Sequence, residues 1–105
     1  MQEALAALAE PRRREILRLV WRDELPAGEI AAHFDVTRPA VSKHLRVLKR
    51  AGLVLERRAG TQRIYRADPA AMAELRAMLE TFWEDGLRGV KAAAESHSRR
   101  GRRDR

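Results

Sequence analysis

The chain has 105 residues and a formal net charge of +7, and this length predicts one small domain, for which dimerisation would add stability. Because it contains no cysteine, disulfides, thiolate metal sites, iron–sulfur clusters and cysteine nucleophiles are excluded. No apolar run approaches the roughly 18 residues of a membrane-spanning helix, and the N-terminus lacks the basic start of a signal peptide, so we expect a cytoplasmic protein.

The first third of the chain is predicted to form three helices. Apolar residues recur at helical spacing at Ala4, Leu5 and Leu8. Pro11 is well placed to open a second helix that ends at Trp21 or Arg22. Pro26 suits the first turn of a short third helix that continues through Phe34.

A fourth helix is predicted over residues 38–51. Thr37 is the expected N-cap, Pro39 lies in the first turn, and Gly52 is the expected stop. One face of this helix is apolar, with Val41, Leu45 and Leu48. The opposite, solvent-facing side is polar and cationic, with Arg38, Pro39, Ser42, Lys43, Arg46 and Lys49.

The rest of the chain is predicted to form a β-hairpin, a long helix and a basic tail. β-prone residues occupy 53–58 and 63–66 on either side of a turn. Asp68 before Pro69 favours a helix start, and apolar residues then repeat every three or four positions in a helix that extends to residue 94. Residues 96–105 contain five arginines and no apolar residue. We therefore expect one domain over residues 1–95 and a disordered basic tail over 96–105.

Positive charge concentrates in the middle of the chain. Residues 37–66 carry nine Lys and Arg against one acid, Glu56, for a net charge of +8. Two short helices followed by a basic hairpin are the element order of a winged helix-turn-helix, so the predicted fold class is mainly α with a small β-hairpin. A basic block on this fold favours double-stranded DNA as the partner.

Each part of the basic block has an expected role at DNA. Base edges or phosphates lie within reach of residues near the start of the fourth helix: Arg38, Ser42 and Lys43. Phosphate contacts are expected farther along, from Arg46, Lys49 and Arg50. Thr37 is expected to touch a phosphate while it caps the helix. The hairpin offers a wing over residues 57–63, with Arg57, Arg58 and Arg63.

Four segments resemble the ArsR/SmtB family of winged-helix bacterial repressors: residues 6–13, 37–45, 48–54 and 60–65. The resemblance spans roughly residues 4–95, and the Arg-Pro-Ala-Val-Ser-Lys-His-Leu stretch over 38–45 is its most specific part. It implies a homodimer that binds a palindromic operator and represses its own operon. It also implies that DNA is faced by Arg38, Pro39, Ser42, Lys43, Arg46 and the wing.

The sensing sites of the family are not matched. Pro26 and Gly28 occupy the positions of the family's Cys-x-Cys metal ligands. The family's second site pairs Asp-x-His with His-x-x-Glu, whereas here Asp85 is followed at the second position by Leu87 and His97 at the third by Arg100. We therefore predict no metal and no cofactor, and the resemblance assigns no effector. His33 and His44 are expected to be structural.

The last helix is predicted to form a dimer interface. A helix over residues 69–94 is longer than a domain this small can cover by itself, so its apolar stripe needs a partner surface. We expect it to pair with its mate and with the first helix across a two-fold axis, through Ala4, Leu5, Leu8, Phe82, Trp83, Leu87 and Val90. Two recognition helices would then lie about 34 Å apart and bind an inverted repeat.

The prediction is a homodimeric, sequence-specific transcriptional regulator, a repressor that binds DNA through residues 38–51 in the major groove. The alternative is a winged-helix module for protein–protein contacts, which the +8 segment disfavours. RNA binding is disfavoured because Tyr65 is the only aromatic residue between Thr37 and Asp68. An enzyme is not expected, since Ser42 and His44 are two apart on a helix and point away from each other.

Overall fold

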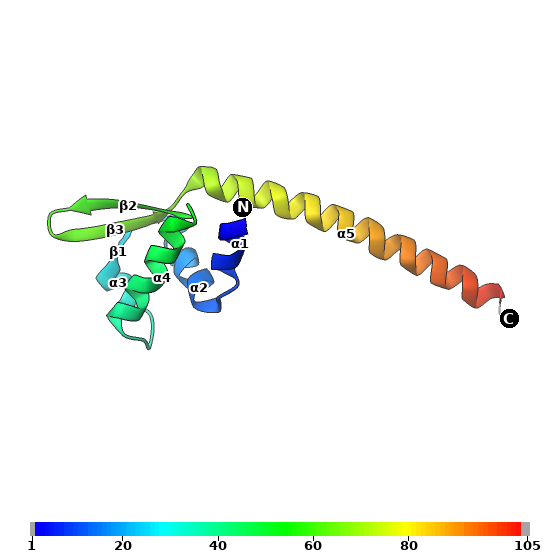
Figure 1. Ribbon diagram of the computed structural model, residues 1–105, viewed down its shortest axis with the longest axis horizontal. Helices are drawn as coiled ribbons and strands as arrows, with labels where there is room; N and C mark the ends of the chain where they lie inside the picture. Colours follow the sequence, from blue (N-terminus) through cyan, green and yellow to red (C-terminus); the bar gives the residue numbers. More distant parts are fainter. Residues whose placement is uncertain (1, 104–105) are drawn as a thin grey trace. The chain divides into compact units, whose positions relative to one another are not determined.

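The computed structural model describes residues 2–103, and the side chains of residues 2–95. The chain divides into two compact units, residues 1–72 and 73–105. Along the chain the elements are α1 (Gln2–Leu8), α2 (Pro11–Leu19), β1 (Leu25–Pro26), α3 (Ala27–Ala32), α4 (Arg38–Arg50), β2 (Val54–Ala59), β3 (Gln62–Ala67) and α5 (Pro69–Arg103). Helices α1–α4 and the three strands belong to the first unit (Figure 1), so the predicted winged helix-turn-helix order is confirmed.

Helix α4 has the capping residues that the sequence predicts. The Thr37 hydroxyl accepts a hydrogen bond from the Ala40 N–H at 3.3 Å, which satisfies one of the free donors at the helix start. At the other end Gly52 has φ +76°. The N–H groups of Gly52 and Leu53 donate to the Lys49 and Leu48 carbonyls, each at 3.0 Å. This is the Schellman arrangement, and it turns the chain directly into the wing.

The core of the first unit forms around α4. This helix packs against α1, α2, α3 and β2 (Figure 1). Its inward face is almost completely buried at Val41, Leu45 and Leu48. The residues that meet this face include Ile16, Leu17, Val20, Ile30, Leu53 and Val54. Since the apolar face is fully occupied, the polar face of α4 must point outward.

The sheet has one strand more than the sequence predicted. Strands β2 and β3 form the expected antiparallel hairpin, with Val54 opposite Ala67 and Ala59 opposite Gln62. The additional strand, β1, pairs with β3 through Leu25 and Pro26, so the strand order is β1-β3-β2. The sequence predicts Pro26 inside a helix. It instead lies on an edge strand, where its missing N–H costs no sheet hydrogen bond.

Two predicted helices are shorter than expected. Helix α2 ends at Leu19, because the chain tightens there and the Trp21 N–H bonds to the Arg18 carbonyl at 3.4 Å. Helix α3 ends at Ala32, with His33 as its C-cap and the Phe34 N–H bonded to the Ala31 carbonyl at 3.1 Å. In both cases bonds of the tighter 3₁₀ type replace the last predicted turn.

Helix α5 starts as predicted but is longer. The Asp68 carboxylate accepts from the Ala70 N–H at 3.0 Å and caps the helix. The helix then continues to Arg103, past the predicted end at residue 94 and into the segment expected to be disordered. The segment contains no proline and is rich in arginine, a good helix former. Its side chains, and residues 104 and 105, lie outside the described part of the chain. Within the described chain, no helix is both long and apolar enough to cross a membrane.

Candidate nucleic-acid interface

An open groove of about 760 Å³ lies between α4 and the wing. Most of the lining residues are polar, and three of the side chains carry guanidinium groups. The lining residues are Pro26, Ala27, Gly28, Glu29, Arg38, Ser42, Arg46, Thr61, Gln62, Arg63 and Tyr65. The fold therefore brings the start of the recognition helix and the tip of the hairpin, which are separate in sequence, to one cationic groove.

The residues predicted to contact DNA in α4 lie on its outer face. Ser42 is half-buried in the wall of the groove. The other predicted residues are exposed, namely Thr37, Arg38, Pro39, Lys43, Arg46 and Lys49. Their side chains are accessible while the apolar face of the same helix is buried. This face division is the one that helical periodicity predicted.

The wing presents a pair of exposed arginines. Arg58 and Arg63 are directly opposite each other across β2 and β3, and both are exposed. Like charges at opposed strand positions destabilise a hairpin. Neither arginine takes part in an ion pair within the described part of the chain. A phosphate between them would relieve the repulsion, which suits a DNA-facing position.

Two of the cations predicted to contact DNA are paired with carboxylates in the structure. Arg57 donates to Glu24, which lies between α2 and β1. Lys49 donates from Nζ to Glu56 Oε1 at 3.4 Å. The first interaction ties the hairpin to the segment before β1, and the second ties it to α4. Both orient the wing and reduce the positive charge available to a phosphate.

Glu56, the one acid of the basic block, is set between the recognition helix and the wing. Its side chain is only 16% exposed, and Tyr65 is its cross-strand partner. The hydrogen bond from Tyr65 lowers the pKa of Glu56 below its ordinary value; burial opposes this shift, and Lys49 and Arg63 reinforce it. Burial, followed by the Glu56 carboxylate, raises the pKa of Tyr65. The Glu56 carboxylate therefore stays charged and accepts hydrogen bonds from Lys49 and Tyr65.

We expect Glu56→Gln to loosen the wing. At pH 7 the variant should lose about 1 kcal/mol of stability, because the charge-assisted hydrogen bond weakens. Since the folded pKa of Glu56 is lowered, its contribution is present above the unfolded value of 4.5 and is lost as the pH falls through the folded pKa. Thermal melts from pH 3 to 7 should therefore show a flatter pH dependence in the variant.

The matched control for this variant is Glu80→Gln. Glu80 accepts from Arg76 at 2.9 Å on α5, and both side chains are mostly exposed. Removing this charge should change stability very little, since exposed pairs contribute about 0–1 kcal/mol. Equal melting temperatures for the two variants at every pH would contradict the assigned role of Glu56.

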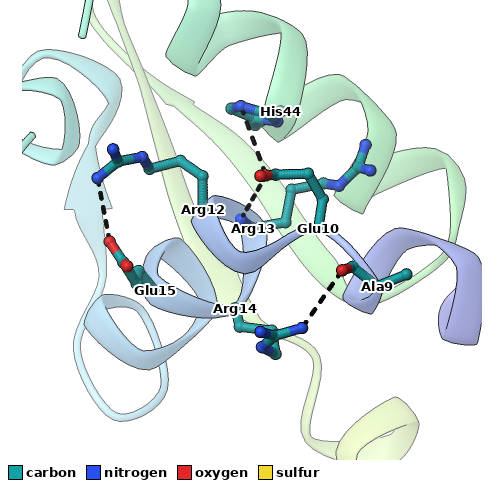
Figure 2. Close-up of polar contacts among 7 residues, drawn as sticks. All are labelled: Ala9, Glu10, Arg12, Arg13, Arg14, Glu15 and His44. Carbon is teal, nitrogen blue, oxygen red and sulfur yellow. Dashed lines mark hydrogen bonds and ion pairs between the residues drawn. The ribbon is translucent and has the colours of Figure 1, made fainter.

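Two of the three consecutive arginines of α2, Arg12 and Arg14, have side-chain contacts that sequence reasoning did not assign (Figure 2). Arg12 donates to Glu15 at 3.1 Å and lies over the Phe34 ring, 5.0 Å from its centroid. Arg14 donates to the Leu8 carbonyl at 2.7 Å and closes the end of α1. Arg14 lies only six residues after Leu8, the last residue of α1. This short separation is the signal that would have identified the contact.

His44 lies on the inner flank of α4, as predicted. It is half-buried, and its Nε2 atom is 3.8 Å from Glu10 Oε2 (Figure 2). Burial raises the pKa of Glu10, but backbone hydrogen bonds from Arg12 and Arg13 and the nearby His44 and Arg13 charges lower it overall. Among the described residues, no group of three or more His, Asp or Glu could hold a metal ion. The contact between His44 and Glu10, the N-cap of α2, links α4 to the start of α2.

The predicted dimer face is exposed on α5 but not uniformly on α1. Phe82 and Trp83 are 73% and 66% exposed, and Leu87 and Val90 are also exposed. Of the three residues predicted for α1, only Leu5 is exposed, at 45%. Ala4 and Leu8 differ from the prediction, since Ala4 is buried in the core and Leu8 packs partly against it. Helix α1 packs against α2 and α4 of its own chain.

A winged helix-turn-helix with a cationic groove between helix and wing is typical of regulators that bind nucleic acid. The family model for bacterial regulatory proteins of the arsR family matches residues 10–55. The HTH-type transcriptional regulator Rv2034 of Mycobacterium tuberculosis is 45% identical over 93 residues, covering 89% of this chain and 87% of that protein. The transcriptional repressor SdpR of Bacillus subtilis is 40% identical over 60 residues, covering 57% and 67%.

Two solved structures are also similar to this chain. A possible transcriptional regulator for arsenical resistance has 46% identity and a TM-score of 0.71, covering 77% of this chain and 84% of its own. A homodimeric winged helix-turn-helix DNA-binding domain from Mycobacterium bovis has 32% identity and a TM-score of 0.66, covering 79% and 77%. The chain belongs to the ArsR family of bacterial regulatory proteins, and it is a winged helix-turn-helix transcriptional regulator.

Proposed function

We propose that the protein is a homodimeric repressor that binds an inverted-repeat operator upstream of its own operon. The observation that carries this proposal is the groove between α4 and the wing, which gathers Arg38, Arg46 and Arg63 around Ser42. An α-helix fits the major groove of B-DNA, and its outward side chains then reach base edges. In this arrangement Ser42 and Lys43 contact bases while the arginines of helix and wing contact phosphates.

The dimer is the second part of the proposal. The apolar stripe of α5 is exposed over several turns, from Leu79 to Val90, and exposed patches of this kind mark interaction surfaces. Leu5 on α1 is the residue of the N-terminal helix that is available to join it. The homodimeric state of the related M. bovis domain supports a two-fold pairing here. Such a pairing presents two recognition helices to successive major grooves.

A repressing role is supported by the names of several relatives. SdpR is a repressor, as are the biofilm growth-associated protein of Agrobacterium fabrum, 34% identical over 79 residues, and the SmtB homologue of Synechocystis, 38% identical over 65 residues. HlyU of Vibrio cholerae, 34% identical over 76 residues, is an activator. We therefore propose repression by occlusion of a promoter, with activation as the outcome that a reporter assay would distinguish.

Fluorescence anisotropy tests the proposal directly. The purified protein is titrated into labelled DNA from its own upstream region and into a scrambled duplex, across a salt series. We expect sequence-dependent binding with two subunits per site, and tighter binding to the upstream DNA by about 10³-fold or more. Equal and steeply salt-sensitive binding to both duplexes would reduce the function to nonspecific polyanion binding. Absence of binding to either duplex would favour the protein-interaction module.

A further inference from the structure

A second hollow lies on the inner flank of the recognition helix, between α1, α2 and α4. It has a volume of about 370 Å³, within the range of small-molecule sites. Its lining combines small apolar side chains with charged ones. The lining residues are Glu3, Ala6, Ala7, Arg13, Val47, Arg50 and Ala51. The DNA-facing groove shares none of these residues, so the two concavities are separate.

Arg13 is the distinctive residue of this hollow. Its Nε atom is buried and has no hydrogen-bond partner among the described residues, although buried donors nearly always have one. Its two neighbours in sequence are satisfied, since Arg12 pairs with Glu15 and Arg14 with the Leu8 carbonyl. Glu10 accepts from the backbone N–H of Arg13. Figure 2 shows the Arg13 guanidinium reaching toward α4, apart from the contacts of Arg12 and Arg14.

The charges of the hollow define the ligand. Arg13 and Arg50 supply two guanidinium groups, and an arginine binds a carboxylate with two parallel hydrogen bonds. Glu3, the one acid of the lining, disfavours a second negative charge. The alanines and Val47 of the lining can contact an apolar group of limited size. We propose that this hollow binds a small monocarboxylate with a compact apolar body, and that the bound molecule changes operator affinity.

The position of the hollow explains the effect on DNA binding. A molecule there touches α1, α2 and the last turns of α4 together, so it changes how the recognition helix is held. If the bound molecule has a higher affinity for one orientation of α4 than for another, it raises the population of that orientation. Operator affinity then changes with the orientation of α4. On α1, Leu5 points away from the side that carries Glu3, Ala6 and Ala7. The proposed dimer contact therefore leaves the hollow open. This regulatory part of the inference rests on the proposed function.

Nuclear magnetic resonance of the full-length protein tests the site without DNA. Benzoate and butyrate are the probes, and benzamide is the uncharged control for benzoate. We expect saturable shifts of the backbone amides of Ala6, Val47 and Ala51 with the carboxylates and not with benzamide. Arg13→Gln should weaken benzoate binding about tenfold, because it removes the charged half of the hydrogen bonds. Arg18→Gln, an exposed change on the same helix, should leave binding unchanged.

A second variant keeps the test decisive if Arg13→Gln unfolds the protein. Ala6→Leu fills the hollow from the exposed side of α1 and should abolish the shifts without removing a charge. No saturable shift with either carboxylate, or equal shifts with benzamide, would overturn the site. Equal weakening by Arg13→Gln and Arg18→Gln would reduce it to nonspecific binding of anions by surface arginines and overturn it as well.

The regulatory part is measured separately. Saturating benzoate should change the operator dissociation constant about fivefold or more, the lower end of ordinary allosteric coupling. Localised benzoate binding with unchanged operator affinity would overturn the regulation and leave the site standing. Localised benzoate binding by a protein that binds no operator would leave the site standing and overturn the proposed repressor function instead.

Discussion

A Leu87→Glu, Val90→Glu double variant should be a monomer that binds the operator about 10²-fold more weakly than the wild-type protein. Both side chains are exposed on the apolar stripe of α5, so the change does not disturb the described core. In a dimer each would be desolvated, and a buried apolar side chain of this size contributes about 1.5–3 kcal/mol. Two unpaired carboxylates in the same place would be strongly unfavourable.

The loss of operator affinity follows from the loss of linkage between half-sites. In a dimer the second recognition helix binds at a high effective concentration, and separating the two halves costs about 10²- to 10⁴-fold. Analytical ultracentrifugation gives the oligomeric state, and anisotropy with the upstream duplex gives the affinity. Helical content should be retained, as checked by circular dichroism.

A matched control adds the same charge to the other side of α5. Thr81→Glu with Ala92→Glu places two carboxylates on exposed positions that lie roughly opposite the apolar stripe at about 100° per residue. This variant should stay dimeric and bind the operator almost normally. If both double variants remain dimers, the interface lies elsewhere; if both are monomers, total charge rather than the stripe controls association.

The recognition helix could be predicted closely from local signals. Thr37, Pro39 and Gly52 mark its ends through interactions within a few residues, and each acts as expected in the structure. The outward face followed from the spacing of three buried positions. Periodicity and capping depend only on neighbours in the chain, so one sequence was sufficient to place the polar face.

The features that the sequence did not predict depend on contacts between residues far apart in the chain. Strand β1 has two residues and exists only because Leu25 meets Tyr65, a pairing that no local pattern indicates. The same is true of Arg57, whose partner Glu24 is 33 residues away. A charge count treats both members of such a pair as free. It therefore does not show that Arg57 and Lys49 are paired with carboxylates in the free chain.

The arginines show why residue type alone did not define the site. Arg14 closes the end of α1 and Arg13 turns into the hollow behind α4, while Arg58 and Arg63 remain exposed and opposed on the wing. All four carry the same group, which serves equally as a helix cap, an anion ligand or a phosphate contact. The packing of the surrounding helices decides among these roles.

Replacing both Ser42 and Lys43 with alanine should remove most of the preference for the operator over random DNA. Ser42 lies in the wall of the groove and Lys43 on the exposed face beside it, at the end of α4 that enters the major groove in the proposed complex. Each lost base contact costs about 1–3 kcal/mol of discrimination. Operator binding should therefore weaken by far more than random-DNA binding, which retains the phosphate contacts.

Arg58→Ala is the comparison that separates base contacts from backbone contacts. Like the double variant it removes one positive charge, but from the wing, where Arg58 opposes Arg63. It should weaken operator and random DNA by similar factors and reduce the slope of log affinity against log salt by about 1. Anisotropy titrations of both variants on both duplexes across the salt series give the four affinities. If the double variant and Arg58→Ala lower all of them uniformly, α4 contacts only the backbone and the specificity must come from the shape of the DNA.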